Sequence, residues 1–240
     1  MINHAGTMAE PKASKLDEAT PALEPDLTAG TCTRKRKGEG CQRRQEILEA
    51  AKRLFAEEGY EKTTIRRIAA SLGISSTALY VYFPDKNAVL AEICASTFRE
   101  LRQHCADLRG AIPSDPLRVL HDAVTHYIQF GLEHPHEYHL TFNMPLPPEV
   151  KDNAEHPGDC AFQSFQALVQ DVVEARQLHG ADGNALTQQL WAGMHGLVSL
   201  VLLRPDFPWV ERSVLVKGHV QLLVEGVLRA ADGRQCGGLG

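Results

Sequence analysis

The sequence of 240 residues lacks an apolar run long enough to cross a membrane. Its longest apolar stretch is Leu197–Leu203, whereas a membrane-spanning helix needs roughly 18 consecutive apolar residues. The charges near the N-terminus are also not followed by the apolar segment that a secretory signal requires. We therefore expect a cytoplasmic protein with no membrane partner.

The sequence also lacks the common motifs of catalysis. It contains no G-x-S-x-G, no H-E-x-x-H and no glycine-rich phosphate-binding loop. We therefore expect no enzyme, no catalytic residue and no cofactor. None of the six cysteines forms a C-x-x-C pair, so free thiols are the expectation. Cys94 and Cys105 are about three helical turns apart, which is too far for a disulfide within one helix; a redox switch stays an alternative.

Metal-binding residue types gather at one place in the sequence. His134, His136, Glu137 and His139 are close enough along the chain to suggest zinc or nickel. Their spacing does not put three ligands on one helical face, however, and Pro135 interrupts the segment. We therefore expect no metal site, although a sensing role for this cluster stays an alternative.

The net charge of −5 is distributed unevenly. Residues 34–90 contain 12 Lys or Arg against 7 Asp or Glu, whereas residues 91–240 contain 11 against 18. A basic segment attached to an acidic body is typical of a protein that reads DNA, with chance variation as the alternative. Residues 1–40 have the composition of a disordered leader. Its basic arm, Arg34–Lys37, is suited to contact phosphates or a minor groove, or is simply a solvated charge run.

The residues after this leader have the pattern of four helices. Apolar residues at spacings of three and four predict a first helix over 42–58, which Gly59 ends. Two short helices follow, the first capped by Thr63 or Thr64 and the second by Ser75, with a tight turn at Gly73 between them. A long helix is predicted over 86–108. Two short helices joined by such a turn are typical of a helix-turn-helix.

The remainder of the chain is also predicted to be helical. Five further helices are expected over residues 116–133, 135–142, 159–179, 184–203 and 208–231. Residues 143–157 contain four prolines and are predicted to form a loop. The last two helices are apolar on more than one face, which indicates burial against a partner subunit, or else a central position in their own domain. The fold class is thus all-α, with about nine helices.

Residues 43–93 strongly resemble the N-terminal domain of the TetR family of repressors. The resemblance is carried by Ile47–Ala51, Leu54–Tyr60, Thr63–Ala69, Leu72–Ser75, Leu79-Tyr80, Tyr82-Phe83 and Lys86. Further along, Trp191–Gly196 resembles the Trp-x-x-x-His-Gly motif of one TetR C-terminal subgroup. The resemblance implies a helix-turn-helix DNA-binding domain over 41–88 and a helical ligand-binding and dimerisation domain over 89–231, followed by a flexible tail over 232–240.

The resemblance also implies how DNA would be read. The third helix would enter the major groove and present Ser75, Ser76, Thr77, Ala78, Tyr80, Val81 and Tyr82. This helix has no Arg, Asn or Gln, so the bidentate contacts that best select guanine or adenine are missing. Arg66 is the candidate for a guanine contact. The candidates for phosphate contacts are Tyr80, Lys86, Thr64, Arg43 and Arg44.

By the same resemblance, an effector pocket would lie among the helices of the C-terminal half. Its candidate residues are Phe98, Tyr127, Phe130, Phe142, Phe162, Phe165, Trp191 and His195, each of which has core packing as its alternative. Trp191 and His195 share one helical face, and Gly196 beside them would permit close packing. His195 would be a polar anchor for a ligand or a buried histidine bonded to a carbonyl.

These expectations together predict a DNA-binding transcriptional regulator. It would be a homodimeric repressor that binds double-stranded DNA at an inverted repeat and that a small-molecule effector releases. The alternatives are a transcriptional activator, or a helical ligand-binding protein or enzyme without specific DNA reading.

Overall fold

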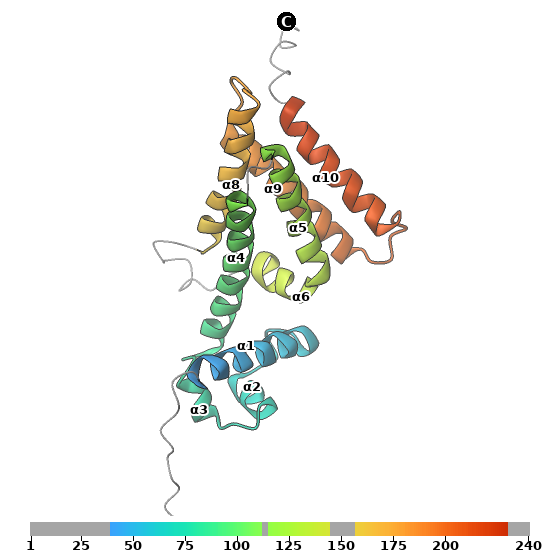
Figure 1. The fold of residues 1–240 in the computed structure, drawn as a ribbon. Helices are drawn as coiled ribbons and strands as arrows, with labels where there is room; N and C mark the ends of the chain where they lie inside the picture. The colour runs from blue at the N-terminus through green and yellow to red at the C-terminus, as the bar shows by residue number, and fades with distance from the viewer. Residues whose placement is uncertain (1–38, 112–114, 145–156, 230–240) are drawn as a thin grey trace, which may run out of the picture. The chain divides into compact units, whose positions relative to one another are not determined.

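The computed structural model describes residues 39–111, 115–144 and 157–229, and their regular structure is helical (Figure 1). This confirms the expected all-α fold. In chain order the elements are α1 (Glu39–Glu58), α2 (Ile65–Ser71), α3 (Ser76–Tyr80), α4 (Lys86–Gly110), α5 (Pro116–Glu133), α6 (Pro135–Tyr138), the π-helical η1 (His139–Asn143), α8 (Pro157–Ala175), α9 (Gly183–Leu203) and α10 (Arg212–Arg229). No helix among the described residues is long and apolar enough to span a membrane.

Some predicted segments lie outside the described residues. These are the leader up to residue 38 with its arm Arg34–Lys37, most of the proline-containing loop, and the tail over 232–240. Of the predicted leader, residues 39 and 40 are described, and they form the first turn of α1.

The helices α1, α2 and α3 share a core with the beginning of α4. Ile47, Ile68, Leu79 and Leu90 are fully buried in this core, one from each helix. Burial of an aliphatic side chain contributes about 1.5–3 kcal/mol, so these residues help to hold the short helices α2 and α3 against α1 and α4. The turn between α2 and α3 has Gly73 at a φ of 65°, a conformation that favours glycine.

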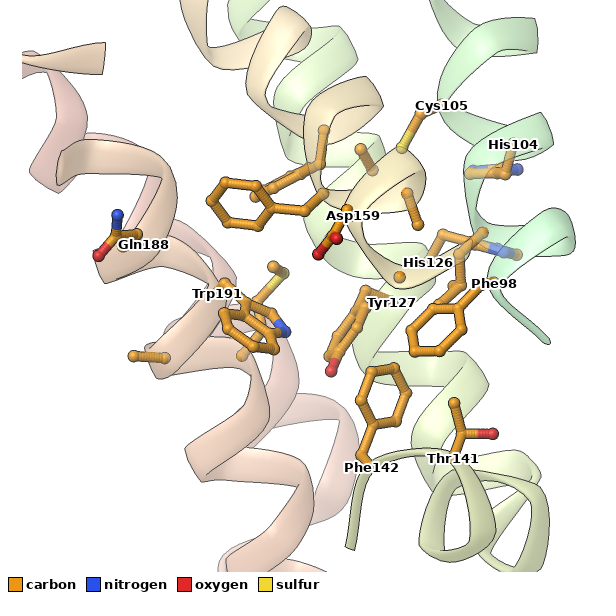
Figure 2. Close-up of a pocket in the computed structure, with 18 of the residues that line it drawn as sticks. Phe98, His104, Cys105, His126, Tyr127, Thr141, Phe142, Asp159, Gln188 and Trp191 are labelled. Carbon is orange, nitrogen blue, oxygen red and sulfur yellow. The ribbon is translucent and has the colours of Figure 1, made fainter. Parts of the chain in front are cut away.

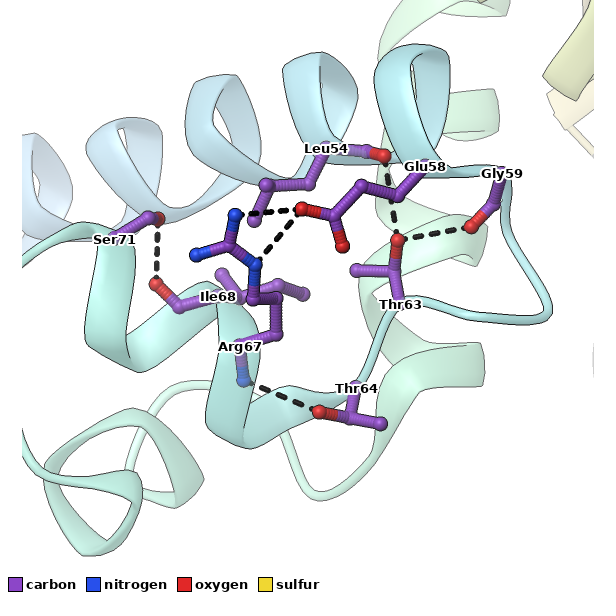
Figure 3. A network of polar contacts seen from close by, with 8 residues as sticks. All are labelled: Leu54, Glu58, Gly59, Thr63, Thr64, Arg67, Ile68 and Ser71. Carbon is purple, nitrogen blue, oxygen red and sulfur yellow. Dashed lines mark hydrogen bonds and ion pairs between the residues drawn. The ribbon is translucent and has the colours of Figure 1, made fainter.

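Polar contacts fix the boundaries of these short helices. The Thr64 hydroxyl accepts a hydrogen bond from the backbone N–H of Arg67, so Thr64 is the N-cap of α2, and Ser75 caps α3 in the same way. Thr63 is instead buried and donates to the carbonyls of Leu54 and Gly59 (Figure 3). Of the two candidates for the first cap, Thr64 is therefore the one observed, and Ser75 caps α3 as predicted.

The remaining helices pack around a second core. α4 lies along α8, and α5 contacts α8, α9 and α10. Leu120, Ile128, Leu168 and Val198 are fully buried there. The helix α4 belongs to both cores, because its first half contributes Leu90 to one and its second half contributes residues to the other.

Close helix packing occurs at a different glycine from the one expected. A Cβ added at Gly196 would meet nothing within 4 Å, so Gly196 does not permit a close contact within this chain. A Cβ at Gly131 would instead lie 2.6 Å from Val198 Cγ1 and 2.9 Å from Tyr138 Cδ2. Gly131 therefore allows α5, α6 and α9 to approach one another.

Several predicted helix boundaries differ from those observed; α1, for example, begins at Glu39 rather than at residue 42. α8 ends at Ala175 rather than at residue 179, because Gln177 adopts a φ of 52° and breaks the helix. α10 begins at Arg212 rather than at residue 208, because the Glu211 carboxylate accepts from the N–H groups of Ser213 and Val214 and starts the helix there. The short helix predicted over 135–142 exists, but its second half is the π-helical turn η1.

Candidate functional site

The short helix α3 presents a small, weakly polar surface. Leu79 is fully buried and anchors α3, while Thr77, Ala78, Tyr80 and Val81 are exposed, Tyr80 to 52% and Val81 to 78%. This pattern leaves a hydroxyl, methyl groups and one phenol free to face a partner.

The predicted reading helix is shorter than expected. α3 ends at Tyr80, so Val81 and Tyr82 lie in the turn that follows it rather than on the helix. The N–H groups of both Tyr82 and Phe83 bond to the Leu79 carbonyl, which closes this turn. Ser75 is the N-cap and Ser76 is half-buried, so neither is as available as Thr77.

The arginines of α1 and α2 differ in whether they form ion pairs within the protein. Arg66, in the first turn of α2, is exposed and forms no ion pair with a described residue. Its neighbour Arg67 pairs with Glu58 at 2.6 Å and ties α2 to the end of α1 (Figure 3). Arg43 pairs with Glu46 at 2.7 Å within one turn of α1. Arg66 is thus the arginine that the fold leaves available beside α3.

Arg44 links α1 to the turn after α3 and to α4. Its guanidinium donates to the Tyr82 carbonyl at 3.1 Å and to the Glu92 carboxylate at 2.7 Å, and it lies 4.3 Å from the centre of the Phe83 ring. Burial alone would raise the pKa of Glu92, but hydrogen bonds from Arg99 and Arg44 outweigh it and hold that pKa below its usual value. Arg44 therefore has internal partners that the sequence did not reveal.

Lys86 is engaged in a similar way. Its ammonium group donates to the Tyr60 carbonyl at 2.8 Å and lies 4.1 Å from the centre of the Tyr60 ring. The Tyr60 hydroxyl in turn donates to Asn87 at 2.6 Å. Lys86 thus fixes the turn after α1 against the start of α4, and its position in the first turn of α4 is as the sequence predicts.

A large cavity lies in the C-terminal half, bounded by α4, α5, η1, α8 and α9 (Figure 2). Its volume is about 850 Å³, which is within the usual range for small-molecule sites. Six of the eight residues predicted to line a pocket do line this cavity, namely Phe98, Tyr127, Phe142, Phe162, Phe165 and Trp191.

The other two predicted residues are not part of the cavity wall. Phe130 is buried on α5 beside the His134 ring. The Nδ1 atom of His195 is hydrogen-bonded to the Tyr138 hydroxyl at 2.5 Å, and its Nε2 atom is 3.4 Å from the Ser199 hydroxyl. Burial lowers the pKa of His195, which favours its neutral form. His195 is therefore not in the cavity wall, and its ring nitrogens face the Tyr138 and Ser199 hydroxyls rather than a ligand site or a carbonyl, the two alternatives that the sequence left open.

Several cavity residues were not predicted from the sequence. His104 on α4 and His126 on α5 stack with ring centres 3.5 Å apart and an interplanar angle of 19°. Burial, and then the neighbouring His104, lower the pKa of His126. Asp159, Gln188 and other polar side chains also line the cavity. The histidines are far apart in sequence, and no periodicity within one helix could have paired them.

The two buried cysteines and the histidine cluster show no reactive or metal-binding arrangement among the described residues. Cys94 and Cys105 are both buried, and burial raises the pKa of each thiol to about 11, which disfavours a reactive thiolate. No group of three or more His, Cys, Asp or Glu side chains in the described ranges could hold a metal ion. Glu137 instead pairs with Lys52 of α1 at 3.4 Å.

Two family models match the chain. The model described as "Bacterial regulatory proteins, tetR family" matches residues 47–93, and the model "Tetracyclin repressor-like, C-terminal domain" matches residues 120–231. The second match includes Trp191–Gly196, whose assignment to the Trp-x-x-x-His-Gly subgroup stays a prediction.

Curated relatives are similar over part of their length. The HTH-type transcriptional regulator AcrR of Shigella flexneri is 32% identical over 96 residues, which are 40% of this chain and 45% of that protein. The HTH-type transcriptional repressor AcnR of Corynebacterium diphtheriae is 35% identical over 85 residues, 35% of this chain and 41% of that protein. The chain thus matches less than half of the length of these relatives.

Solved structures share the fold over most of the chain. FadR from Bacillus subtilis, in complex with stearoyl-CoA, has a TM-score of 0.65 at 15% identity, covering 76% of this chain and 98% of that one. A regulator of the TetR/AcrR family from Thermobifida fusca has a TM-score of 0.61 at 24% identity, covering 77% and 98%. At such low identity these similarities establish the fold alone.

Proposed function

Because the chain belongs to the TetR family of bacterial regulatory proteins, we propose that it is a homodimeric transcriptional repressor, which a small-molecule effector releases from an inverted-repeat operator. The observation that carries this proposal is the pairing of two sites in one chain. A capped helix-turn-helix with an exposed α3 stands on one core, and a cavity of about 850 Å³ lies in the other.

Base contacts in this proposal come from small side chains and one arginine. Thr77, Ala78 and Val81 offer methyl groups to thymine, and the Ser76 and Thr77 hydroxyls bond to base edges. Arg66 is exposed and free to make the bidentate contact that selects guanine. The operator should therefore contain few strongly specified positions per half-site, with one guanine set by Arg66.

Phosphate contacts come from residues around this surface. Tyr80 is exposed at the end of α3, Arg43 pairs within its own helix turn, and Thr64 is the exposed N-cap of α2. Lys86 already donates to the Tyr60 carbonyl and lies against the Tyr60 ring, and Arg44 already donates to Glu92, so each has fewer donors left for a phosphate. We therefore rank Tyr80 and Arg43 above Lys86 and Arg44 as phosphate ligands.

Two further features support dimerisation and effector binding. Leu200, Leu203 and Leu222 on α9 and α10 are more than half exposed, which is unfavourable in water unless a second copy covers them. The structural neighbour FadR from Bacillus subtilis was solved with stearoyl-CoA, so a chain of this fold does hold a small molecule. The aromatic cavity is the corresponding candidate here.

The test is a selection of random duplex DNA on the purified full-length protein. We expect an inverted repeat to be enriched. On that site, Arg66→Ala should weaken binding about tenfold or more and relax the preference for one base. Tyr80→Phe should weaken binding to all sequences alike. Arg118→Ala removes an exposed arginine from α5 and is the matched control, which should leave the affinity unchanged. Folded protein that enriches no sequence would contradict specific DNA reading.

A further inference from the structure

The charged groups of the cavity are unbalanced. Asp159 is the one carboxylate among its described lining residues, and those residues include no lysine or arginine. His104 on α4 and His126 on α5 stack against each other. Burial lowers the pKa of His126 and favours a neutral ring. Apart from the two histidines, Asp159 is therefore the only ionisable acid or base side chain of the Asp, Glu, Lys or Arg type among the described lining residues.

Asp159 has no cationic partner among the residues that the structure describes. It is the third residue of α8, its side chain is exposed, and it forms no ion pair with a described residue. Two other aspartates are, in contrast, paired with arginines: Asp171 with Arg109 and Asp115 with Arg176, each at 2.7 Å. Figure 2 shows the Asp159 carboxylate directed toward the part of the cavity where Tyr127 and Trp191 lie.

Aromatic rings form most of the wall that faces this carboxylate. Phe162 and Trp191 meet edge to face with centres 5.9 Å apart, and Tyr127 and Phe142 do so at 5.8 Å. Trp191 is 42% exposed, so part of its ring is uncovered on the cavity side. The faces of aromatic rings carry negative potential and attract cations, most strongly for tryptophan.

We propose that this cavity binds a hydrophobic organic cation, with its positive centre between Asp159 and the Trp191 ring and its apolar groups among the phenylalanines. This inference rests on the proposed function, since it names the chemical class of the effector. An anionic ligand of the same size would bring its charge toward Asp159 without a lysine or arginine to neutralise it.

The experiment compares two ions of the same shape and opposite charge. Tetraphenylphosphonium and tetraphenylborate are titrated into the full-length protein by calorimetry. We expect the phosphonium ion to bind at least tenfold more tightly than the borate. Asp159→Asn should weaken phosphonium binding about tenfold and reduce the difference between the ions. Glu100→Gln removes an exposed carboxylate outside the cavity and should change neither affinity.

A second variant keeps the test decisive if Asp159→Asn is unstable. Trp191→Leu keeps the position apolar but removes the ring, and it should also weaken phosphonium binding. Equal or tighter binding of the borate, no binding of the phosphonium ion, or full phosphonium affinity in both variants would overturn the proposed ligand class. The operator affinity is measured in parallel with each ion. If the phosphonium ion binds through Asp159 but leaves the operator affinity unchanged, the ligand class stands and effector-driven release fails.

Discussion

Arg44 shows how a residue's role depends on partners that lie far away in sequence. The TetR resemblance places it on an arm that contacts phosphate, and its position in a basic segment agrees with that. In the structure its guanidinium is held by Glu92 and by the Tyr82 carbonyl, residues separated from it by 48 and 38 positions. We therefore expect its contribution to be mainly to stability.

Replacing Arg44 by Met should lower the free energy of unfolding by about 1 kcal/mol, because it removes a charge-assisted hydrogen bond and leaves Glu92 with Arg99 alone. Chemical denaturation of the full-length protein measures this change. Arg43→Met is the matched control, and it should cost only a few tenths of a kcal/mol because its partner is a neighbouring residue on the same exposed helix face. If Arg44→Met were as stable as the parent but bound the operator far more weakly, the phosphate role would be the correct one.

The same contrast explains which residue roles could be predicted from the sequence. The caps at Thr64 and Ser75 follow from rules that act over three residues, and both are observed. The stacked pair of His104 and His126 requires the packing of α4 against α5, which no local pattern specifies. Six aromatic cavity residues could be predicted because large apolar rings on the inner faces of predicted helices are expected to be buried. Polar wall residues such as Asp159 and Gln188 have no hydrophobic pattern that would place them inside.

Among the elements, α6 and η1 connect the two cores. Thr141 and Phe142 of η1 line the cavity, and Phe142 packs on Tyr138 with ring centres 4.9 Å apart. Glu137, the residue before Tyr138, pairs with Lys52 of α1. The sequence predicted a short helix here but not its π-helical turn, in which Leu140 and Thr141 are buried. Such turns are frequent at functional positions, and this one lies between the cavity and α1.

The ion pair between Lys52 and Glu137 should contribute to stability as a unit. The side chains are only 18% and 24% exposed, so the pair is less screened than a surface pair. Burial acts to lower the pKa of Lys52, but Glu137 and Glu49 outweigh it and raise that pKa above 10.5. The contribution of Lys52 to this stabilisation is therefore fully present at neutral pH and is lost as the pH rises through the raised pKa.

A double-mutant cycle on the free energy of unfolding measures this contribution. Lys52→Met, Glu137→Gln and the double variant should reveal a favourable interaction of about 0.5–1 kcal/mol at pH 7. Lys52→Met with Glu49→Gln is the comparison cycle, and its interaction should be smaller because Glu49 is 55% exposed. Additive effects of Lys52→Met and Glu137→Gln would show that α6 is not held to α1 through this pair.

At the scale of the whole molecule, the remaining question is what covers the last two helices. The sequence predicted that they are apolar on more than one face. In the structure one apolar face is buried in the body and another is exposed. Leu190 and Val198 of α9 are buried in the body, while Leu203 is 75% exposed and Leu222 of α10 is 73% exposed. Hydrophobic periodicity identifies such an excess, but it cannot say whether the second face meets the same chain or another.

We expect Leu222→Glu to convert the protein from a dimer to a monomer, because a charge at the centre of an apolar contact between two copies would lose its hydration without a partner. Light scattering should then give the mass of one chain, 26.4 kDa, instead of twice that value. Gln103→Glu adds the same charge to an exposed position on α4 and should leave the dimer intact. The monomer should also bind the inverted repeat no more tightly than a single half-site, since a two-fold dimer gains its affinity by engaging both halves at once. A Leu222→Glu protein that stays dimeric, together with a dimeric Leu203→Glu, would place the subunit contact elsewhere and leave this exposed face to another partner.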